Sequence, residues 1–162
     1  MKLIITDIKN PKFNISGEHK IISPENEVKP CIGCFSCWVK TPGRCAIHDG
    51  YENTGIDMSK CDELIIVSEC RYGSVSSFVK AVQDRAISYI HPCFVIKKGE
   101  MHHKRRYENT ITMSAYFYGS NITDSEKENA TELMQSNADN YNGELHSVSF
   151  YNSVQELEGI TL

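Results

Sequence analysis

The hydrophobic pattern along the chain predicts strands that alternate with helices. Residues 2–6 and 63–67 are short, nearly continuous apolar runs, as expected of strands buried on both faces. Residues 110–117 and 145–150 are two further strands, and residues 19–23 form a weaker one. The chain therefore carries about five strands, enough for one central sheet.

Two helices are predicted between the later strands. Serines at positions 74, 76 and 77 precede a helix that runs to about Ile90, with Val79, Val82 and Ala86 on one face. Thr123 and Glu126 form a capping box that opens a second helix through about residue 139. Residues 154–158 form a short terminal helical turn. Strands that alternate with helices favour an α/β fold with a parallel sheet and right-handed crossovers.

The connection between the first two strands is unusually short. Residues 8–18 contain Asn10, Pro11 and Gly17, which are typical of turns, whereas a parallel crossover needs about a dozen residues and usually a helix. We therefore expect the first crossover helix to be absent. Residues 19–23 would then be an antiparallel edge strand or merely an extended segment. The whole chain, residues 1–162, is expected to form one domain.

Composition excludes several functional classes. Forty per cent of the 162 residues are apolar and the formal net charge is −4, so a nucleic-acid partner is not expected. No apolar run is long enough to span a bilayer, and the N-terminus resembles a strand rather than a secretory signal. A cytoplasmic location is expected, where thiols stay reduced. Seven cysteines there indicate metal, redox or packing roles rather than disulfides.

Four of the cysteines are closely spaced, at Cys31, Cys34, Cys37 and Cys45. Thiolates at this spacing can surround one small metal or metal-sulfur centre without ligands from distant parts of the fold. Three alternatives remain open for this run: a 4Fe-4S cluster, zinc, or cysteines that pack as small apolar side chains.

Several segments together resemble the flavodoxin-like NAD(P)H-dependent FMN reductases and the related iron-sulfur flavoproteins. They are residues 29–38, Cys45 with Asp49 four residues on, the apolar strand 64–67, residues 68–76, and Lys80 with the pair Asp84 and Arg85. The resemblance implies a flavodoxin-like three-layer sandwich with a parallel central sheet and, here, a shortened first crossover. It also implies FMN, NAD(P)H as co-substrate, a 4Fe-4S cluster on the four cysteines, a small-molecule or protein electron acceptor, and a homodimer or homotetramer.

The flavin site implied by the resemblance lies where strands end. In open α/β sheets, ligands bind outside the carboxyl ends of the strands. The candidate FMN-binding residues are therefore those that follow two predicted strands: Ser68, Glu69, Cys70, Arg71, Tyr72, Gly73, Tyr118 and Gly119. No side chain is identified as a catalytic acid or base.

The first loop departs from the family pattern. The family has a Ser/Gly-rich turn and a helix N-terminus there, which cradle the FMN phosphate. This chain instead has Thr6, Asp7 and Ile8 followed by Asn10 and Pro11, and Asp7 carries a charge of the wrong sign. The alternative function is thus a non-enzymatic flavodoxin-like partner or scaffold subunit that has lost FMN binding. A thiol-based redox sensor is a third reading.

The segment 97–106 is the only local concentration of basic residues. It could receive the phosphates of NADPH or FMN, because arginine forks suit phosphate, or it could be a solvated loop. His102 and His103 are adjacent, so on a strand they would face opposite sides and make a poor metal site.

Overall fold

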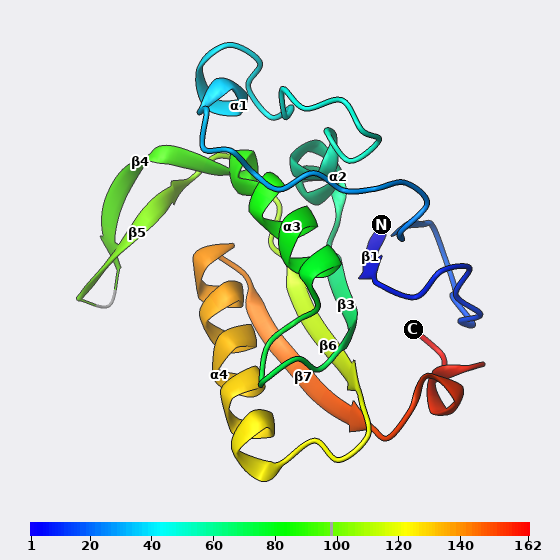
Figure 1. Ribbon diagram of the computed structural model, residues 1–162. Coiled ribbons are helices and arrows are strands. Elements are labelled where there is room, and N and C mark those ends of the chain that lie inside the picture. The colour runs from blue at the N-terminus through cyan, green and yellow to red at the C-terminus, as the bar shows by residue number, and fades with distance from the viewer. Residues whose placement is uncertain (98) are drawn as a thin grey trace.

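Five parallel strands form the central sheet of the computed structural model, which describes residues 1–97 and 99–162. The strand order is β2-β1-β3-β6-β7 (Figure 1). The strands are β1 (Lys2–Thr6), β2 (His19–Ile22), β3 (Glu63–Glu69), β6 (Thr112–Tyr118) and β7 (Glu144–Tyr151). This arrangement confirms the predicted flavodoxin-like α/β fold.

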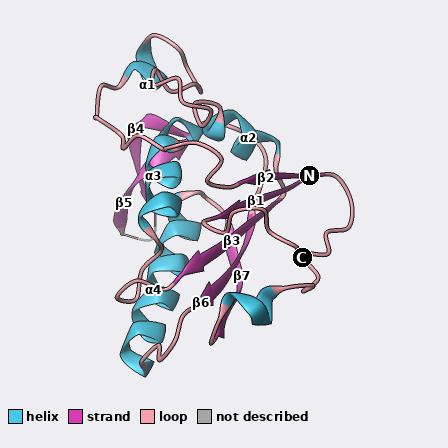
Figure 2. Cartoon of the chain, turned by 45° about the vertical axis from the view of Figure 1, so that its right-hand side comes forward, coloured by secondary structure: helices cyan, strands magenta, loops and turns pink. Residues whose placement is uncertain are grey.

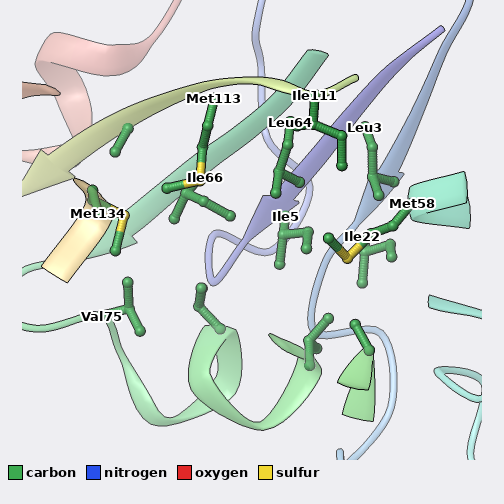
Figure 3. Close-up of a cluster of buried hydrophobic side chains, with 14 of the residues drawn as sticks. Leu3, Ile5, Ile22, Met58, Leu64, Ile66, Val75, Ile111, Met113 and Met134 are labelled. Carbon is green, nitrogen blue, oxygen red and sulfur yellow. The ribbon is translucent and has the colours of Figure 1, made fainter. Parts of the chain in front are cut away.

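Helices cover one face of this sheet. They are α2 (Thr54–Lys60), α3 (Ser77–Arg85) and α4 (Asp124–Asn140), and a 3-10 turn, η1 (Ile87–Tyr89), follows α3. Ser76 caps α3, and the predicted capping box of Thr123 and Glu126 is present at the start of α4. The main hydrophobic core lies between these helices and the sheet (Figures 2 and 3). Leu3, Ile5, Leu64, Ile66 and Met113 come from three neighbouring strands, and Met58 and Met134 come from the helices.

The opposite face is covered without a long helix. Among the described residues, no helix lies between β1 and β2, as predicted. The C-terminal segment with its 3-10 turn η2 (Val154–Leu157) packs there instead, where Leu157 and Leu162 contact Ile4, Ile65 and Val67. This segment also supplies backbone partners for the short crossover: the Asn14 amide donates to the Ile160 carbonyl at 2.8 Å, and the Leu162 amide donates to the Asn14 carbonyl at 2.9 Å.

The predicted antiparallel edge strand is wrong in one respect. β2 is an edge strand, but it pairs with β1 in parallel, with Leu3 opposite Lys20 and Ile5 opposite Ile22. An extended chain advances about 3.3 Å per residue, so residues 7–18 are long enough to return along a five-residue strand without a helix. The C-terminal segment satisfies backbone groups of the connection that a crossover helix would otherwise satisfy internally.

A two-stranded hairpin, β4 (Ile90–Lys97) and β5 (Glu100–Arg105), is detached from the central sheet. In Figure 1 it extends from the end of η1, away from the other strands. A solvated loop was one reading of the basic segment 97–106, yet its residues 100–105 form the second strand of this hairpin. Residue 98 of that segment lies outside the described residues. No helix in the described part of the chain is long and apolar enough to cross a membrane.

Candidate functional site

All four clustered cysteines line one cavity of about 320 Å³. The cavity lies beside the short helix α1 (Ser36–Val39) and the C-terminal end of α3, and Trp38, Arg85 and Ile87 also line it. Cys31 and Cys34 are exposed, whereas Cys37 and Cys45 are buried. The spacing of the cysteines along the chain thus corresponds to a shared position in space.

Backbone geometry and one indole group hold this cysteine loop in place. Phe35 adopts a left-handed conformation, with φ of 56°, immediately before α1. The Trp38 indole donates to the carbonyls of Ile87 and Ile90, at 3.3 Å and 3.0 Å. These two carbonyls lie at either end of η1, so Trp38 ties the loop to the connection between α3 and the hairpin.

Arg85 lines the wall of the cavity together with the four cysteines. Its side chain is fully buried, and its guanidinium pairs with Asp49 and donates to the Ile47 carbonyl at 2.7 Å. Arg85 and its sequence neighbour Asp84 thus form separate ion pairs, Arg85 with Asp49 and Asp84 with Lys80. Burial acts to lower the pKa of Arg85, but the hydrogen bonds with Asp49 and the Cys45 thiol outweigh it and raise that pKa. A permanent positive charge therefore lies beside Cys45.

The ionisation of the thiols differs across the cavity. Hydrogen bonding from the side chain and backbone of Ser36 lowers the pKa of Cys34. Burial, and then the neighbouring Cys45, Cys31 and Cys34, raise the pKa of Cys37. Ionisation of Cys37 is thus disfavoured by its burial and by the three neighbouring cysteines. A metal centre would remove this penalty, because metals bind cysteine as thiolate.

The donor groups that line the cavity can be compared with what a metal ion and an iron-sulfur cluster each require. In the described residues, no three His, Cys, Asp or Glu side chains are close enough together to hold one metal ion. A cubane iron-sulfur cluster holds its four thiolates farther apart than one zinc ion does, because each thiolate binds a different iron. The Nε atom of Arg85 is also buried without a hydrogen-bond partner. A buried guanidinium with a spare N–H is suited to the negative charge of a thiolate-ligated cluster.

Asp7 joins the carboxyl ends of β1, β3 and β6, where the flavin phosphate was expected. Its carboxylate accepts the Glu69 backbone N–H at 2.9 Å, the Tyr118 hydroxyl at 2.9 Å and the Ser68 hydroxyl at 3.5 Å. Burial, and then the Asp7 carboxylate, raise the pKa of Tyr118. A side-chain carboxylate therefore accepts hydrogen bonds where a phosphate cradle would need free donors.

Three further predicted flavin residues, Cys70, Arg71 and Gly119, are also engaged within the protein. The Cys70 amide donates to the Tyr118 carbonyl at 2.8 Å, and the Gly119 amide donates to the Tyr151 carbonyl at 3.1 Å. The Arg71 amide bonds within a tight turn to Ser74, and the Arg71 guanidinium pairs with Glu69.

The tip of that turn offers no cradle either. Tyr72 is 91% exposed there, and a Cβ on Gly73 would lie 2.7 Å from the Asn129 side chain of α4. Five cavities among the described residues are lined by residues other than the Ser68–Gly73 loop, Tyr118 and Gly119. Three of the residues predicted to bind FMN, Ser68, Glu69 and Tyr118, thus contact Asp7, the acidic residue that follows the first strand in the sequence. FMN binding by the predicted residues stays a prediction.

In Figure 1, helix α1, whose residues help to line the cysteine cavity, and the connection between β3 and α3 lie toward opposite ends of the sheet. α3 begins beside Ser68, whose hydroxyl accepts the Ser76 N–H at 2.8 Å, and it ends at Arg85 in the cysteine cavity. Nine helical residues span about 13 Å at 1.5 Å per residue. Within one chain, a ligand at the flavin loop would therefore not touch a group held by the cysteines.

The two adjacent histidines face opposite sides of the hairpin, as predicted. His103 contacts the rings of Trp38 and Phe94, with centroids 5.4 Å and 4.5 Å away. His102 hydrogen-bonds the Asn140 side chain at 3.3 Å. The hairpin thus packs against both the cysteine loop and the end of α4.

Comparison with known proteins gives one informative similarity. No protein-family model matches the chain. An iron-sulfur flavoprotein of Methanocaldococcus jannaschii is 36% identical over 85 residues, which are 52% of this chain and 43% of that protein. The chain thus spans less than half the length of this relative. The fold and this partial similarity together give a flavodoxin-like α/β protein with a distant resemblance to an iron-sulfur flavoprotein.

Proposed function

We propose that this protein is an electron-transfer protein that carries a 4Fe-4S cluster on Cys31, Cys34, Cys37 and Cys45. The observation that carries the proposal is the convergence of all four thiols on one cavity beside a buried arginine. The similarity to a protein named an iron-sulfur flavoprotein supports the same class of chemistry. When bound, such a cluster supplies a one-electron redox centre.

The residues around the cavity would bind and tune the cluster. Cys37 and Cys45 would anchor it on the buried side, and Arg85 would favour its negative charge. Cys31 and Cys34 lie on the exposed side, where electrons would enter and leave.

Exposed apolar side chains adjoin this opening. Ile32, Phe35 and Val39 are 71%, 59% and 77% exposed, and Phe94, Ile96 and Met101 continue an apolar surface along the hairpin. Large exposed apolar patches typically mark protein contacts, and an isolated two-stranded hairpin is marginally stable in water. We therefore expect a homodimer or homotetramer that covers this surface, measurable by sedimentation velocity.

A second candidate function concerns the flavin. A more specific hypothesis, that the protein is an NAD(P)H-dependent FMN reductase, requires FMN at the carboxyl ends of the strands. The hydrogen bonds that Asp7 accepts from Glu69 and Tyr118 favour the alternative, a partner subunit without its own FMN phosphate site. In that case the electron donor or acceptor of the cluster is a flavin on another chain.

Anaerobic reconstitution with iron and sulfide tests the cluster. We expect a broad absorbance that dithionite bleaches, with the iron and sulfide content of a 4Fe-4S cluster. Cys34→Ser should abolish this absorbance and leave the circular dichroism unchanged, because Cys34 is exposed. Cys93→Ser is the matched control, because Cys93 is also exposed but lies outside the cavity. Full absorbance in Cys34→Ser would contradict the assignment.

Titration of the protein with FMN and with riboflavin tests the flavin reading. A functional phosphate cradle would make FMN bind far more tightly than riboflavin, which lacks the phosphate. We expect no gain from the phosphate, because Asp7 already accepts the donors at that end of the sheet. A large preference for FMN would restore the reductase reading.

A further inference from the structure

Helix α4 carries a stripe of carboxylates on its exposed side. Asp124, Glu128 and Glu132 are exposed and recur every four residues, so they lie in one row along the helix. Lys127 contacts Asp124 at 3.4 Å, whereas Glu128 and Glu132 form no ion pair in the part of the chain that the structure describes. Like charges at this spacing destabilise a helix, and a cation from another molecule would relieve them. A groove of about 330 Å³ is lined by Glu128, Glu132 and their neighbours Lys127 and Thr131.

The hairpin carries the opposite charge. With histidines neutral, residues 97–106 contain five basic residues and one acidic residue, a net charge of +4, whereas α4 contains five acidic residues and one lysine, a net charge of −4. Lys104 is exposed, and Arg105 donates to the Asn109 carbonyl at 2.6 Å and to the Thr110 hydroxyl at 3.0 Å. Among the described residues, neither cation pairs with a carboxylate. Both are therefore available to a second molecule.

Within one chain the two charged regions adjoin but do not meet. The His102 side chain hydrogen-bonds Asn140, the last residue of α4, at 3.3 Å. Lys104 is two residues from His102 on β5, so it lies on the same face of the hairpin, the face toward α4. Glu132 and Glu128 precede Asn140 by eight and twelve residues, which is about 12 and 18 Å along the helix. In Figures 1 and 2 the hairpin and α4 lie on the same side of the molecule, so one surface is positive at one end and negative at the other.

We infer that two copies of this chain pair through this surface about a two-fold axis, with β5 of each copy against the carboxylate stripe of α4 on the other. A two-fold axis brings the same surface of two subunits together in opposite directions. A surface with opposite charges at its two ends is then complementary to itself. Charge complementarity of this kind determines the orientation of the partners and excludes wrong ones.

This contact is separate from the apolar surface near the cysteines. Met101 and Lys104 are three residues apart on β5, so their side chains point to opposite faces of the hairpin. The exposed apolar side chain of Met101 is thus left for another contact. Two different contacts are what a homotetramer with two-fold symmetry requires. None of Lys104, Glu128 and Glu132 lines the cysteine cavity, so the inference does not depend on a cluster.

Sedimentation velocity of the full chain, kept free of metal, tests the contact in low salt and in about 1 M salt. The Debye length falls to about 3 Å at the higher concentration, so attraction between exposed charges is screened. We expect the association to weaken by about tenfold or more, because several exposed ion pairs are screened together.

Charge reversal tests which residues meet. Glu128→Lys with Glu132→Lys reverses the stripe, and Lys104→Glu with Arg105→Glu reverses the exposed charges of β5. Each double variant alone should lose the contact, because its two regions then carry the same sign. A mixture of the two variants should associate, because each positive region then faces a negative one. Circular dichroism checks that each variant is folded, and the stripe variant with the salt series still tests the contact if the β5 variant does not fold.

Glu25→Lys with Glu27→Lys is the matched control. It changes the net charge by the same amount at two exposed positions after β2, at the sheet edge opposite β7. Association that is lost in the stripe variant, kept in the control and restored in the mixture supports the contact. A wild-type chain that is monomeric in low salt would overturn it, as would equal association of the stripe variant and the control. A failed cluster reconstitution would leave this result unchanged, because the protein in the test is metal-free.

Discussion

Replacement of Arg85 by methionine is expected to destabilise the protein more than any single surface change. The variant leaves the Asp49 carboxylate, whose side chain is only 7% exposed, without its cation. It also removes the donor that bonds the Ile47 carbonyl at 2.7 Å. Breaking a buried ion pair from one side costs about 3–5 kcal/mol, because a charge is left buried and unpaired.

The matched control lies on the same helix. Lys80→Met breaks the ion pair with Asp84, whose side chains are 60% and 44% exposed. Exposed pairs at this spacing contribute about 0.5 kcal/mol or less. The double variant Arg85→Met with Asp49→Leu should recover much of the loss, because it replaces both charges with apolar groups.

Urea unfolding of the metal-free protein at neutral pH measures these differences. Thermal unfolding gives a second measure. For a chain of this size, a loss of 1 kcal/mol lowers the thermal midpoint by about 2–4 °C, so the thermal midpoint of Arg85→Met should be about 6–20 °C below that of the wild type. A loss below about 1 kcal/mol in Arg85→Met, or a double variant less stable than the single one, would refute the reasoning.

The same pair sets an acid dependence. Burial acts to raise the pKa of Asp49, but the Arg85 hydrogen bond and the amides of Lys29 and Tyr51 outweigh it, so the folded pKa is lowered. Because the pKa of Asp49 is lower in the folded state than in the unfolded state, its ionised form stabilises the fold. This stabilisation is complete above the pKa of an unfolded aspartate, about 3.9, and is lost as the pH falls through the pKa of Asp49 in the folded state. Wild-type stability should therefore decline below about pH 4, and Asp49→Asn should show a shallower decline in urea midpoints over that range.

Four further substitutions test the remaining structure by thermal or urea unfolding. Tyr118→Phe should cost about 1–2 kcal/mol, because it removes a hydrogen bond to the charged Asp7, and an unchanged midpoint would argue against that contact. Gly73→Ala should destabilise the fold more than Gly17→Ala. Both glycines have positive φ, but only at position 73 would a Cβ collide with α4. Equal losses of stability in the two variants would contradict this packing. Leu157→Ala should cost about 2–5 kcal/mol, since Leu157 is 1% exposed against the second sheet face, and a loss under 1 kcal/mol would mean that the C-terminal segment does not pack there.

Signals carried by neighbouring residues were read correctly from the sequence. The apolar runs at residues 2–6 and 63–67 form adjacent parallel strands, because such runs suit strands buried on both faces. The capping box at Thr123 depends only on residues three positions apart, and it is present in the structure. The missing first crossover helix followed from the turn residues in that loop.

Short elements without a strong period were missed. α1 and α2 have four and seven residues, too few for a helical repeat to stand out. The hairpin was missed because its second strand is a basic run that pairs with residues 90–97 only once the turn has closed. β2 was assigned the wrong direction because its parallel pairing depends on the C-terminal segment, more than 130 residues away in the chain.

For the candidate site, the sequence by itself determined which residues could gather, and the tertiary structure decided what surrounds them. The four cysteines lie within 15 positions, so any compact fold of that loop brings them close. The Arg85–Asp49 pair joins residues 36 positions apart, and the contact of Asp7 with Tyr118 joins residues 111 apart. Such contacts form only when the sheet and helices are packed, because burial and strand order, rather than local spacing, determine which charges and hydroxyls meet.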